Sequence, residues 1–164
     1  YEDIALLMKR HVGAYAVEAE KYYDRIVFNY LFNNGDAHLK NFSLCQTPSG
    51  DYVLSPAYDM IDTRIHIPSD SFFALRGGLF SGEYSTESFK VLGFYAYDDF
   101  YEFGRKISLM ESRITKILDK YRNEDEDAKD LVSRSFLGDE VKTLYGSHYS
   151  DRLRMLNNSY AKKI

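Results

Sequence analysis

Asn34-Gly35-Asp36-Ala37-His38-Leu39-Lys40-Asn41 is the stretch that organises this 164-residue chain, together with its counterpart Ser55-Pro56-Ala57-Tyr58-Asp59-Met60. Two short apolar segments separate the two polar clusters. Asp36, Asn41 and Asp59 carry hard oxygen atoms, and each stands beside a reversal of the chain. Mg²⁺ takes carboxylate and other oxygen ligands when it also binds phosphates. The stretch therefore predicts a site for a phosphate-bound metal ion.

A long amphipathic helix is predicted directly before the first cluster, over residues 14–33. Its apolar and aromatic residues recur at the spacing of one buried helix face. They are Ala19, Tyr23, Ile26, Val27, Tyr30 and Leu31. Asn33-Asn34-Gly35 is predicted to end the helix, with Gly35 free to take the positive φ of a helix stop. The helix then delivers Asp36 as a loop residue held by a rigid element.

A β-hairpin is predicted between the two clusters. Phe42-Ser43-Leu44-Cys45 and Tyr52-Val53-Leu54 are short and β-prone, and they flank the turn-forming stretch 47–51. Antiparallel pairing joins the start of the first strand to the end of the second, so Asn41 and Asp59 are expected to be spatial neighbours. Cys45 lies in an apolar run and is expected to be buried and inert.

The rest of the chain predicts a mainly α (α+β) fold. Helices are expected over residues 3–10, 86–92 (capped by Ser85 or Thr86 and stopped by Gly93), 97–106, 111–121 and 139–157. In the last helix the inward residues are expected to be Val141, Leu144, Tyr145, His148, Leu153 and Leu156. Residues 61–84 are irregular, which is often a functional feature. The acidic run 123–130 is expected to be solvated, and Lys162-Lys163 to be a frayed tail.

Length and composition limit the classes that the chain can belong to. Residues 1–164 are long enough for one domain, divided here into 1–60, 61–84 and 85–160. A net charge of −4 weighs against direct nucleic-acid binding. A single cysteine excludes an internal disulfide and suits a cytoplasmic protein. We expect no membrane contact, since no apolar run approaches the ~20 residues that span a bilayer. The chain begins at Tyr1, not Met, and is expected to be a fragment or a processed chain.

Asp36 and Asn41 have the Asp-x-x-x-x-Asn spacing of a protein-kinase catalytic loop. In that arrangement Asp36 is the base that orients an acceptor hydroxyl, and Asn41 and Asp59 supply oxygens to Mg²⁺. His38 could bind phosphate or brace Asp36, and Lys40 could neutralise a phosphate charge. The alternatives are a helix C-cap or turn aspartate at 36, a helix cap at 59, a buried structural histidine at 38 and a solvated lysine at 40.

Other catalytic constellations are not supported. His11, His66 and His148 have no ligand spacing with one another and no cysteine partner, so a zinc site is not expected. The chain has no Gly-x-Ser-x-Gly motif and neither of the glycine-rich phosphate-binding motifs.

The two clusters, extended to Leu44 and to Ile61, resemble the C-terminal domain of HipA-like bacterial serine/threonine kinases, the toxin kinases of HipA–HipB toxin–antitoxin systems. The resemblance implies a kinase-like helical C-lobe with the hairpin between its catalytic and metal-binding loops. It implies Asp36 as catalytic base with His38 beside it, and Asn41 and Asp59 as Mg²⁺ ligands. The implied ATP-binding residues are His38, Leu39, Lys40, Asn41, Tyr58 and Asp59.

The resemblance also implies partners that this chain does not contain. Family members carry an N-terminal lobe with the phosphate-covering loop, the ATP-binding lysine and the hinge. They act on Ser/Thr of protein substrates and are restrained by a DNA-binding, HipB-like antitoxin. We therefore expect the isolated chain to transfer phosphate poorly or not at all. A non-catalytic regulatory lobe, a phosphoinositide-like or small-molecule kinase lobe, and a Mg²⁺-dependent phosphohydrolase remain alternatives.

Overall fold

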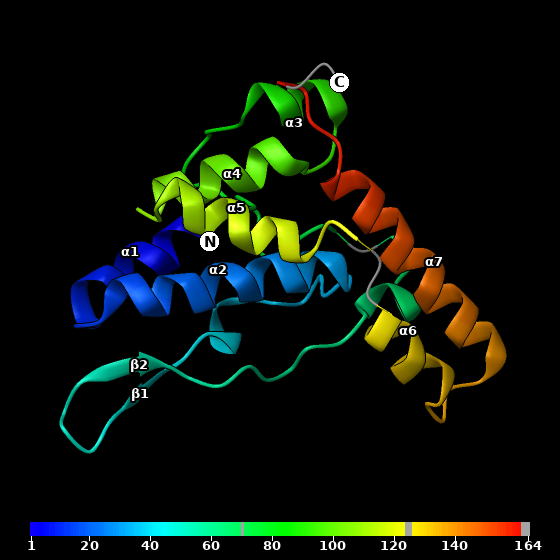
Figure 1. Ribbon diagram of the computed structural model, residues 1–164, viewed down its shortest axis with the longest axis horizontal. Coiled ribbons are helices and arrows are strands. Elements are labelled where there is room, and N and C mark those ends of the chain that lie inside the picture. The colour runs from blue at the N-terminus through cyan, green and yellow to red at the C-terminus, as the bar shows by residue number, and fades with distance from the viewer. Residues whose placement is uncertain (70, 124–125, 162–164) are drawn as a thin grey trace.

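The computed structural model describes residues 1–69, 71–123 and 126–161. The helices in these ranges are α1 (Glu2–His11), α2 (Tyr15–Leu31), α3 (Glu87–Leu92), α4 (Tyr97–Lys106), α5 (Glu111–Lys120), α6 (Glu126–Ser133) and α7 (Asp139–Leu156). The strands β1 (Leu44–Gln46) and β2 (Tyr52–Leu54) form one antiparallel hairpin, and the 3₁₀ turns are η1 (Leu39–Asn41) and η2 (Thr63–Ile65). The predicted mainly helical fold with a small hairpin is confirmed (Figure 1).

Helix α2 lies across the middle of the molecule, with α1, α5, α7 and β2 all packed against it (Figure 1). Tyr22, Tyr23 and Tyr30 project from α2 and are fully buried. A buried hydroxyl needs a hydrogen-bond partner, and each of these donates to a backbone carbonyl of another segment. The acceptors lie 3.0, 2.9 and 2.6 Å away, at Tyr1, Phe100 and Tyr95 respectively. The predicted core helix is therefore tied by polar as well as apolar contacts.

At the end of α2, the residue that reverses the chain is not the one predicted. The left-handed backbone conformation occurs at Asn33, with φ of 55°, and not at Gly35. Asparagine tolerates this region better than most residues because its short polar side chain can hydrogen-bond locally. The carbonyl of Asn33 accepts from the backbone N–H and the hydroxyl of Thr63, at 3.1 and 3.0 Å. The residue that ends the helix, Asn33, is therefore also hydrogen-bonded to a distant segment of the chain.

The hairpin forms as predicted, but β1 starts two residues later than expected and pairs Leu44 with Leu54. The predicted burial of Cys45 is wrong, because its side chain is exposed. In a two-stranded sheet alternate residues face opposite sides, and of the β2 residues, which pack against α2, only Leu54 is buried. Glu18 of α2 fixes the strand there, since its carboxylate accepts from the N–H of Leu54 at 2.9 Å.

The helices of the second half follow the predicted boundaries closely. Thr86 caps α3 by accepting from the N–H of Phe89 at 3.0 Å, and Gly93 stops it with φ of 74°. In residues 61–84, apart from the undescribed position 70, η2 is the only assigned helix or strand, as expected of an irregular segment. None of the described helices combines the length and apolar character needed to cross a membrane.

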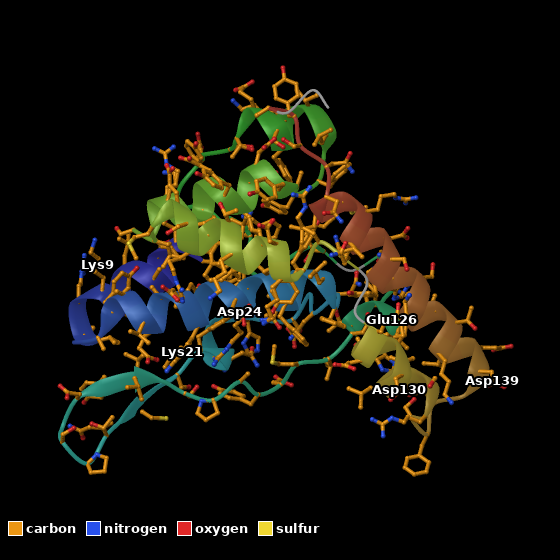
Figure 2. The ribbon with its side chains drawn as sticks, in the orientation of Figure 1. Lys9, Lys21, Asp24, Glu126, Asp130 and Asp139 are labelled. Carbon is orange, nitrogen blue, oxygen red and sulfur yellow. The ribbon has the colours of Figure 1, made fainter. Side chains whose placement is uncertain are left out.

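Helix α7 lies on the right of Figure 1, with its first half (orange) at the lower end beside α6. His148, Leu153 and Leu156 are buried and Val141 and Tyr145 are half-buried, but the predicted burial of Leu144 is wrong, since it is 40% exposed. Few elements cover this outer end of the helix. The acidic run does begin a helix with exposed side chains, and Figure 2 shows Glu126 and Asp130 on it. Glu124, Asp125, Lys162 and Lys163 lie outside the described residues.

Candidate functional site

Asn41 and Asp59 meet, as the hairpin predicted. The amide nitrogen of Asn41 donates to a carboxylate oxygen of Asp59 at 2.5 Å. Its amide oxygen accepts from the backbone N–H of His38 at 3.0 Å, which closes the η1 turn. Asn41 is buried whereas Asp59 is exposed. The carboxylate of Asp59 therefore faces solvent, and the buried side chain of Asn41, itself hydrogen-bonded to His38, holds it in place.

Asp59 has the left-handed backbone conformation, with φ of 55°. Aspartate, like asparagine, adopts this region more readily than most residues because its short polar side chain can hydrogen-bond locally. Its carbonyl accepts from the amide nitrogen of Asn34 at 2.9 Å, and its side chain accepts from Asn41. Contacts on both the backbone and the side chain thus hold Asp59 in this conformation.

Asn34 connects the two polar loops and was not predicted to have any role beyond ending the helix. It is 3% exposed. Its amide nitrogen also donates to the side-chain oxygen of Asn29 at 3.1 Å, and its amide oxygen accepts from the N–H of Asp36 at 3.3 Å. One buried amide therefore contacts α2, the loop of Asp36 and the loop of Asp59.

Asp36 is exposed, and its carboxylate makes no hydrogen bond or ion pair with the described residues. The backbone around it is nevertheless fixed. Its carbonyl accepts from the N–H of His38 at 2.7 Å, and the hydroxyl of Tyr1 donates to the carbonyl of Ala37 at 2.6 Å. The backbone of this loop is therefore fixed by hydrogen bonds, while the carboxylate of Asp36 is available to a ligand.

The remaining predicted site residues surround η1. Leu39 and Lys40 are exposed. The hydroxyl of Tyr58 donates to the carbonyl of Lys40 at 2.6 Å and lies 2.8 Å from the hydroxyl of Ser43, so it joins the second cluster to the first. The ring of His38 is half-buried, and its Nδ1 is buried without a hydrogen-bond partner among the described residues. A buried imidazole nitrogen without a partner is costly, which makes His38 a candidate for contact with a bound ligand.

The donor set fits a magnesium ion that shares its coordination with phosphates. Within the described residues there is no group of three or more His, Cys, Asp or Glu side chains that could hold a metal. Asp59 offers a solvent-facing carboxylate. The amide nitrogen of Asn41 faces that carboxylate, while its amide oxygen accepts from the N–H of His38 and has a second lone pair for a metal ion. Mg²⁺ is commonly bound by one or two carboxylates plus substrate phosphates and waters, and needs no larger protein cage.

A second set of contacts fastens the loops together behind these side chains. The hydroxyl of Thr63 accepts from the N–H of Gly35 at 2.9 Å while it donates to the carbonyl of Asn33. Asp62 lies 3.1 Å from Nδ1 of His148, and Arg152 donates to the amide oxygen of Asn33 at 2.8 Å. None of these roles was predicted from the sequence. The available signal was the occurrence of the polar residues His148 and Arg152 four positions apart on an otherwise inward-facing side of a helix.

The chain is similar to a known family of domains and to two named proteins. The family model of the HipA-like C-terminal domain matches residues 1–128. A Haemophilus influenzae protein named "Putative kinase" is 28% identical over 163 residues, which are 96% of this chain and 48% of that protein. A Sinorhizobium fredii protein named "Putative kinase Y4dM" is 45% identical over 51 residues, 31% of this chain and 12% of that protein. The chain thus spans about half the length of the first relative and a smaller share of the second.

Proposed function

The chain belongs to the family of HipA-like C-terminal domains, and we propose that it is the lobe of an ATP- and Mg²⁺-dependent serine/threonine protein kinase that holds the catalytic base and the metal ligands. The observation that carries the proposal is the contact between Asn41 and Asp59 beside the loop of Asp36. This contact brings the loop with the Asp-x-x-x-x-Asn spacing of a kinase catalytic loop next to the loop that carries Asp59. The names of the two relatives support a kinase.

Asp36 is the proposed base. A phosphoryl acceptor hydroxyl must be oriented toward the phosphate and must finally lose its proton, and a loop carboxylate can do both. The carboxylate of Asp36 is exposed and free of partners among the described residues, while the backbone on either side of it is hydrogen-bonded. It can therefore accept the hydrogen bond of an incoming serine or threonine without first breaking one of its own.

Asn41 and Asp59 are the proposed metal ligands, through the amide oxygen and the solvent-facing carboxylate. A bound Mg²⁺ would neutralise charge on the transferring phosphate. Lys40 is exposed beside them and adds a positive charge for phosphate oxygens. His38, through its unpartnered Nδ1, supplies a further polar contact, and Leu39 and Tyr58 complete the surface of the nucleotide site.

The proposal includes a lobe that lies outside this chain. Phosphoryl transfer also needs a lysine and a loop that cover the phosphates, and no such motif was found here. The Haemophilus relative is about twice as long as the matched region, which leaves room for such a lobe. We propose an N-terminal kinase lobe as partner, a protein substrate with a Ser or Thr acceptor, and restraint by a HipB-like antitoxin in the cytoplasm.

The test compares Mg²⁺-ATP binding, by calorimetry, and phosphate transfer in the 164-residue chain and in a form extended at its N-terminus. In the extended form Asp59→Asn should weaken Mg²⁺-ATP binding at least about tenfold, as expected when a metal site loses a ligand or its support. Asp36→Asn should leave binding intact and reduce transfer by about 10²–10⁴-fold, the usual contribution of general-base catalysis.

Asp127→Asn is the matched control, because Asp127 is an exposed aspartate of α6, a helix that packs against α7. It should change neither quantity. Equal Mg²⁺-ATP binding in the Asp59 variant and the parent would overturn the proposed metal site. No binding in either form would favour a regulatory lobe. ATP-dependent transfer by the isolated chain that disappears in Asp36→Ala would refute the need for a second lobe.

A further inference from the structure

One buried face of α7 reaches both loops of the candidate site. His148 and Arg152 are four residues apart, so they lie on the same side of the helix, and their exposed fractions are 7% and 3%. Both are beyond residues 1–128, the part of the chain that the family model matches. In Figure 1 α7 runs past the end of α2 and past η2, the two elements next to the polar loops.

Arg152 contacts the start of the loop that carries Asp36. Its Nε donates to the amide oxygen of Asn33 at 2.8 Å. Its guanidinium lies over the rings of Phe72 and Tyr30, 4.3 and 4.9 Å from their centroids. Burial lowers the pKa of Arg152 from its ordinary value. A buried guanidinium loses hydration, and here the amide oxygen and the two ring faces replace it.

Asn33 is also hydrogen-bonded to Thr63, which follows the loop that carries Asp59. Its left-handed backbone sets the direction in which the chain leaves α2, three residues before Asp36. Its carbonyl accepts from both the N–H and the hydroxyl of Thr63, and that hydroxyl in turn accepts from the N–H of Gly35. Holding Asn33 therefore holds Gly35 and Thr63 against each other.

His148 contacts the end of the loop that carries Asp59. Its Nδ1 lies 3.1 Å from one carboxylate oxygen of Asp62, and both side chains are buried. The other carboxylate oxygen of Asp62 accepts from the N–H of Arg64 at 3.0 Å and so caps η2. The position of η2, which starts four residues after Asp59, is thus fixed from α7.

We propose that His148 and Arg152 are positioning residues, through which α7 sets the placement of the Asp36 loop relative to the Asp59 loop. Neither side chain belongs to the proposed nucleotide or metal site, since they contact Asp62, Asn33 and the rings of Tyr30 and Phe72. The proposal deepens the proposed function and rests on it for its catalytic meaning. Its structural part, that α7 holds Asn33, Gly35 and Thr63 together, can be measured without a nucleotide.

The test removes the donor group of Arg152 and follows the two amides that join the loops. Arg152→Met keeps a long unbranched apolar side chain but loses the guanidinium over the two rings and its hydrogen bond to Asn33. Amide hydrogen exchange at Gly35 and Thr63 should accelerate about tenfold relative to the core amides of α2, which reports local rather than global opening. Arg152→Lys, which keeps a donor, should recover part of the protection.

Leu153→Ala is the matched control. Leu153 is the next residue on α7 and is buried in the hydrophobic core, so its truncation should destabilise the whole fold. A purely structural role of α7 predicts that Leu153→Ala accelerates exchange at Gly35 and Thr63 as selectively as Arg152→Met does. That result, or unchanged exchange in Arg152→Met, would overturn the proposal.

Mg²⁺-ATP binding by the N-terminally extended form provides the second readout. Arg152→Met should weaken it about tenfold at a temperature where the variant is folded by circular dichroism, as is typical when a supporting group is lost. Leu153→Ala should leave the affinity of the folded fraction unchanged. If the parent form binds no Mg²⁺-ATP, the proposed function fails, while the exchange rates still decide whether α7 positions the loops.

Discussion

Buried amide side chains hold the polar loops in place at the scale of single residues. Asn33, Asn34 and Asn41 are all less than 7% exposed, and each uses its amide oxygen as an acceptor. Asn34 and Asn41 also donate to Asp59. A neutral amide can donate and accept at once, and its burial costs far less than that of a carboxylate. The neutral amides therefore fix the backbone, and the exposed carboxylates of Asp36 and Asp59 keep oxygen lone pairs available for a ligand.

Asp99 provides a prediction at this scale. It is fully buried, and its carboxylate accepts from the hydroxyl of Thr86 and, at 2.7 Å, from the N–H of Ala96. Burial raises the pKa of Asp99 above its ordinary value of 3.8, although the hydrogen bonds from Thr86 and Ala96 oppose the shift. A carboxyl with a raised folded-state pKa adds stability below its unfolded pKa and loses that contribution as pH rises through the folded value.

The free energy of unfolding of the parent, relative to Asp99→Asn, should therefore fall as pH increases from below 4 through the raised pKa and then stay level. Urea unfolding of both proteins across this range measures the difference. An advantage of the parent that grows with pH would show that the two hydrogen bonds outweigh desolvation.

Contacts that depend on neighbouring residues could be predicted from the sequence, whereas contacts between distant residues could not. The meeting of Asn41 and Asp59 follows from a hairpin whose turn and strands are all read from neighbouring residues. The contact of Asn33 with Arg152 joins positions 119 residues apart, and that of Asp62 with His148 joins positions 86 apart. No local pattern specifies such pairs, since they depend on where α7 packs.

Close helix packing decides the geometry at the scale of elements. Helices α4 and α5 pack against each other where Gly104 faces Ile114, which is fully buried. A Cβ atom at Gly104 would lie 2.7 Å from two carbon atoms of the Ile114 side chain. Real Cβ atoms do not come this close, so glycine is required by the distance between the helices and not by its backbone angles.

Gly104→Ala should therefore lower the free energy of unfolding by about 1–3 kcal/mol through overpacking. Gly146→Ala is the matched control, because Gly146 is also inside a helix but nothing lies within 4 Å of its added Cβ. There the better helix propensity of alanine should raise stability by up to about 1 kcal/mol. Thermal or urea unfolding measures both, and equal effects in the two variants would contradict the packing argument.

Helix positions were predicted well because each helix carries its own periodicity and its own stop, such as Gly93 after α3. Burial was predicted less well at the edges. Cys45 and Leu144 belong to apolar patterns and are nevertheless exposed. A pattern shows which face of an element is apolar, but whether another element covers that face is a property of the complete fold.

Aromatic packing dominates the molecule as a whole. The chain has fifteen tyrosines, eleven phenylalanines and no tryptophan. Tyr22, Tyr23 and Tyr30 are buried in the core around α2. Each hydroxyl is hydrogen-bonded to a carbonyl of another segment, so the tyrosines connect the N-terminal segment, α4 and the α3–α4 connection to one helix. Such a core depends on these hydroxyls staying protonated.

Alkaline pH should consequently unfold the protein in one cooperative step. Burial raises the pKa of Tyr22, Tyr23 and Tyr30 above their ordinary value of 10.0. For a raised pKa the stability is fully present below the unfolded value and is lost as pH rises above it, because only the unfolded chain can release the protons. Each such tyrosine removes up to about 1.4 kcal/mol per pH unit. Three together remove about 4 kcal/mol per unit, enough to exhaust a typical stability of roughly 5–15 kcal/mol within a few units.

Far-ultraviolet circular dichroism and tyrosinate absorbance, recorded along one alkaline titration, test this prediction. Loss of helix and the ionisation of the buried tyrosines should coincide. Tyr23→Phe should make the transition less steep by about one proton, whereas Tyr52→Phe, at an exposed position of β2, should leave its steepness unchanged. If every tyrosine ionised near pH 10 while the helical signal persisted, the hydroxyls of α2 could not be holding the core together, because a protein anchored by buried neutral phenols cannot ionise them and remain folded.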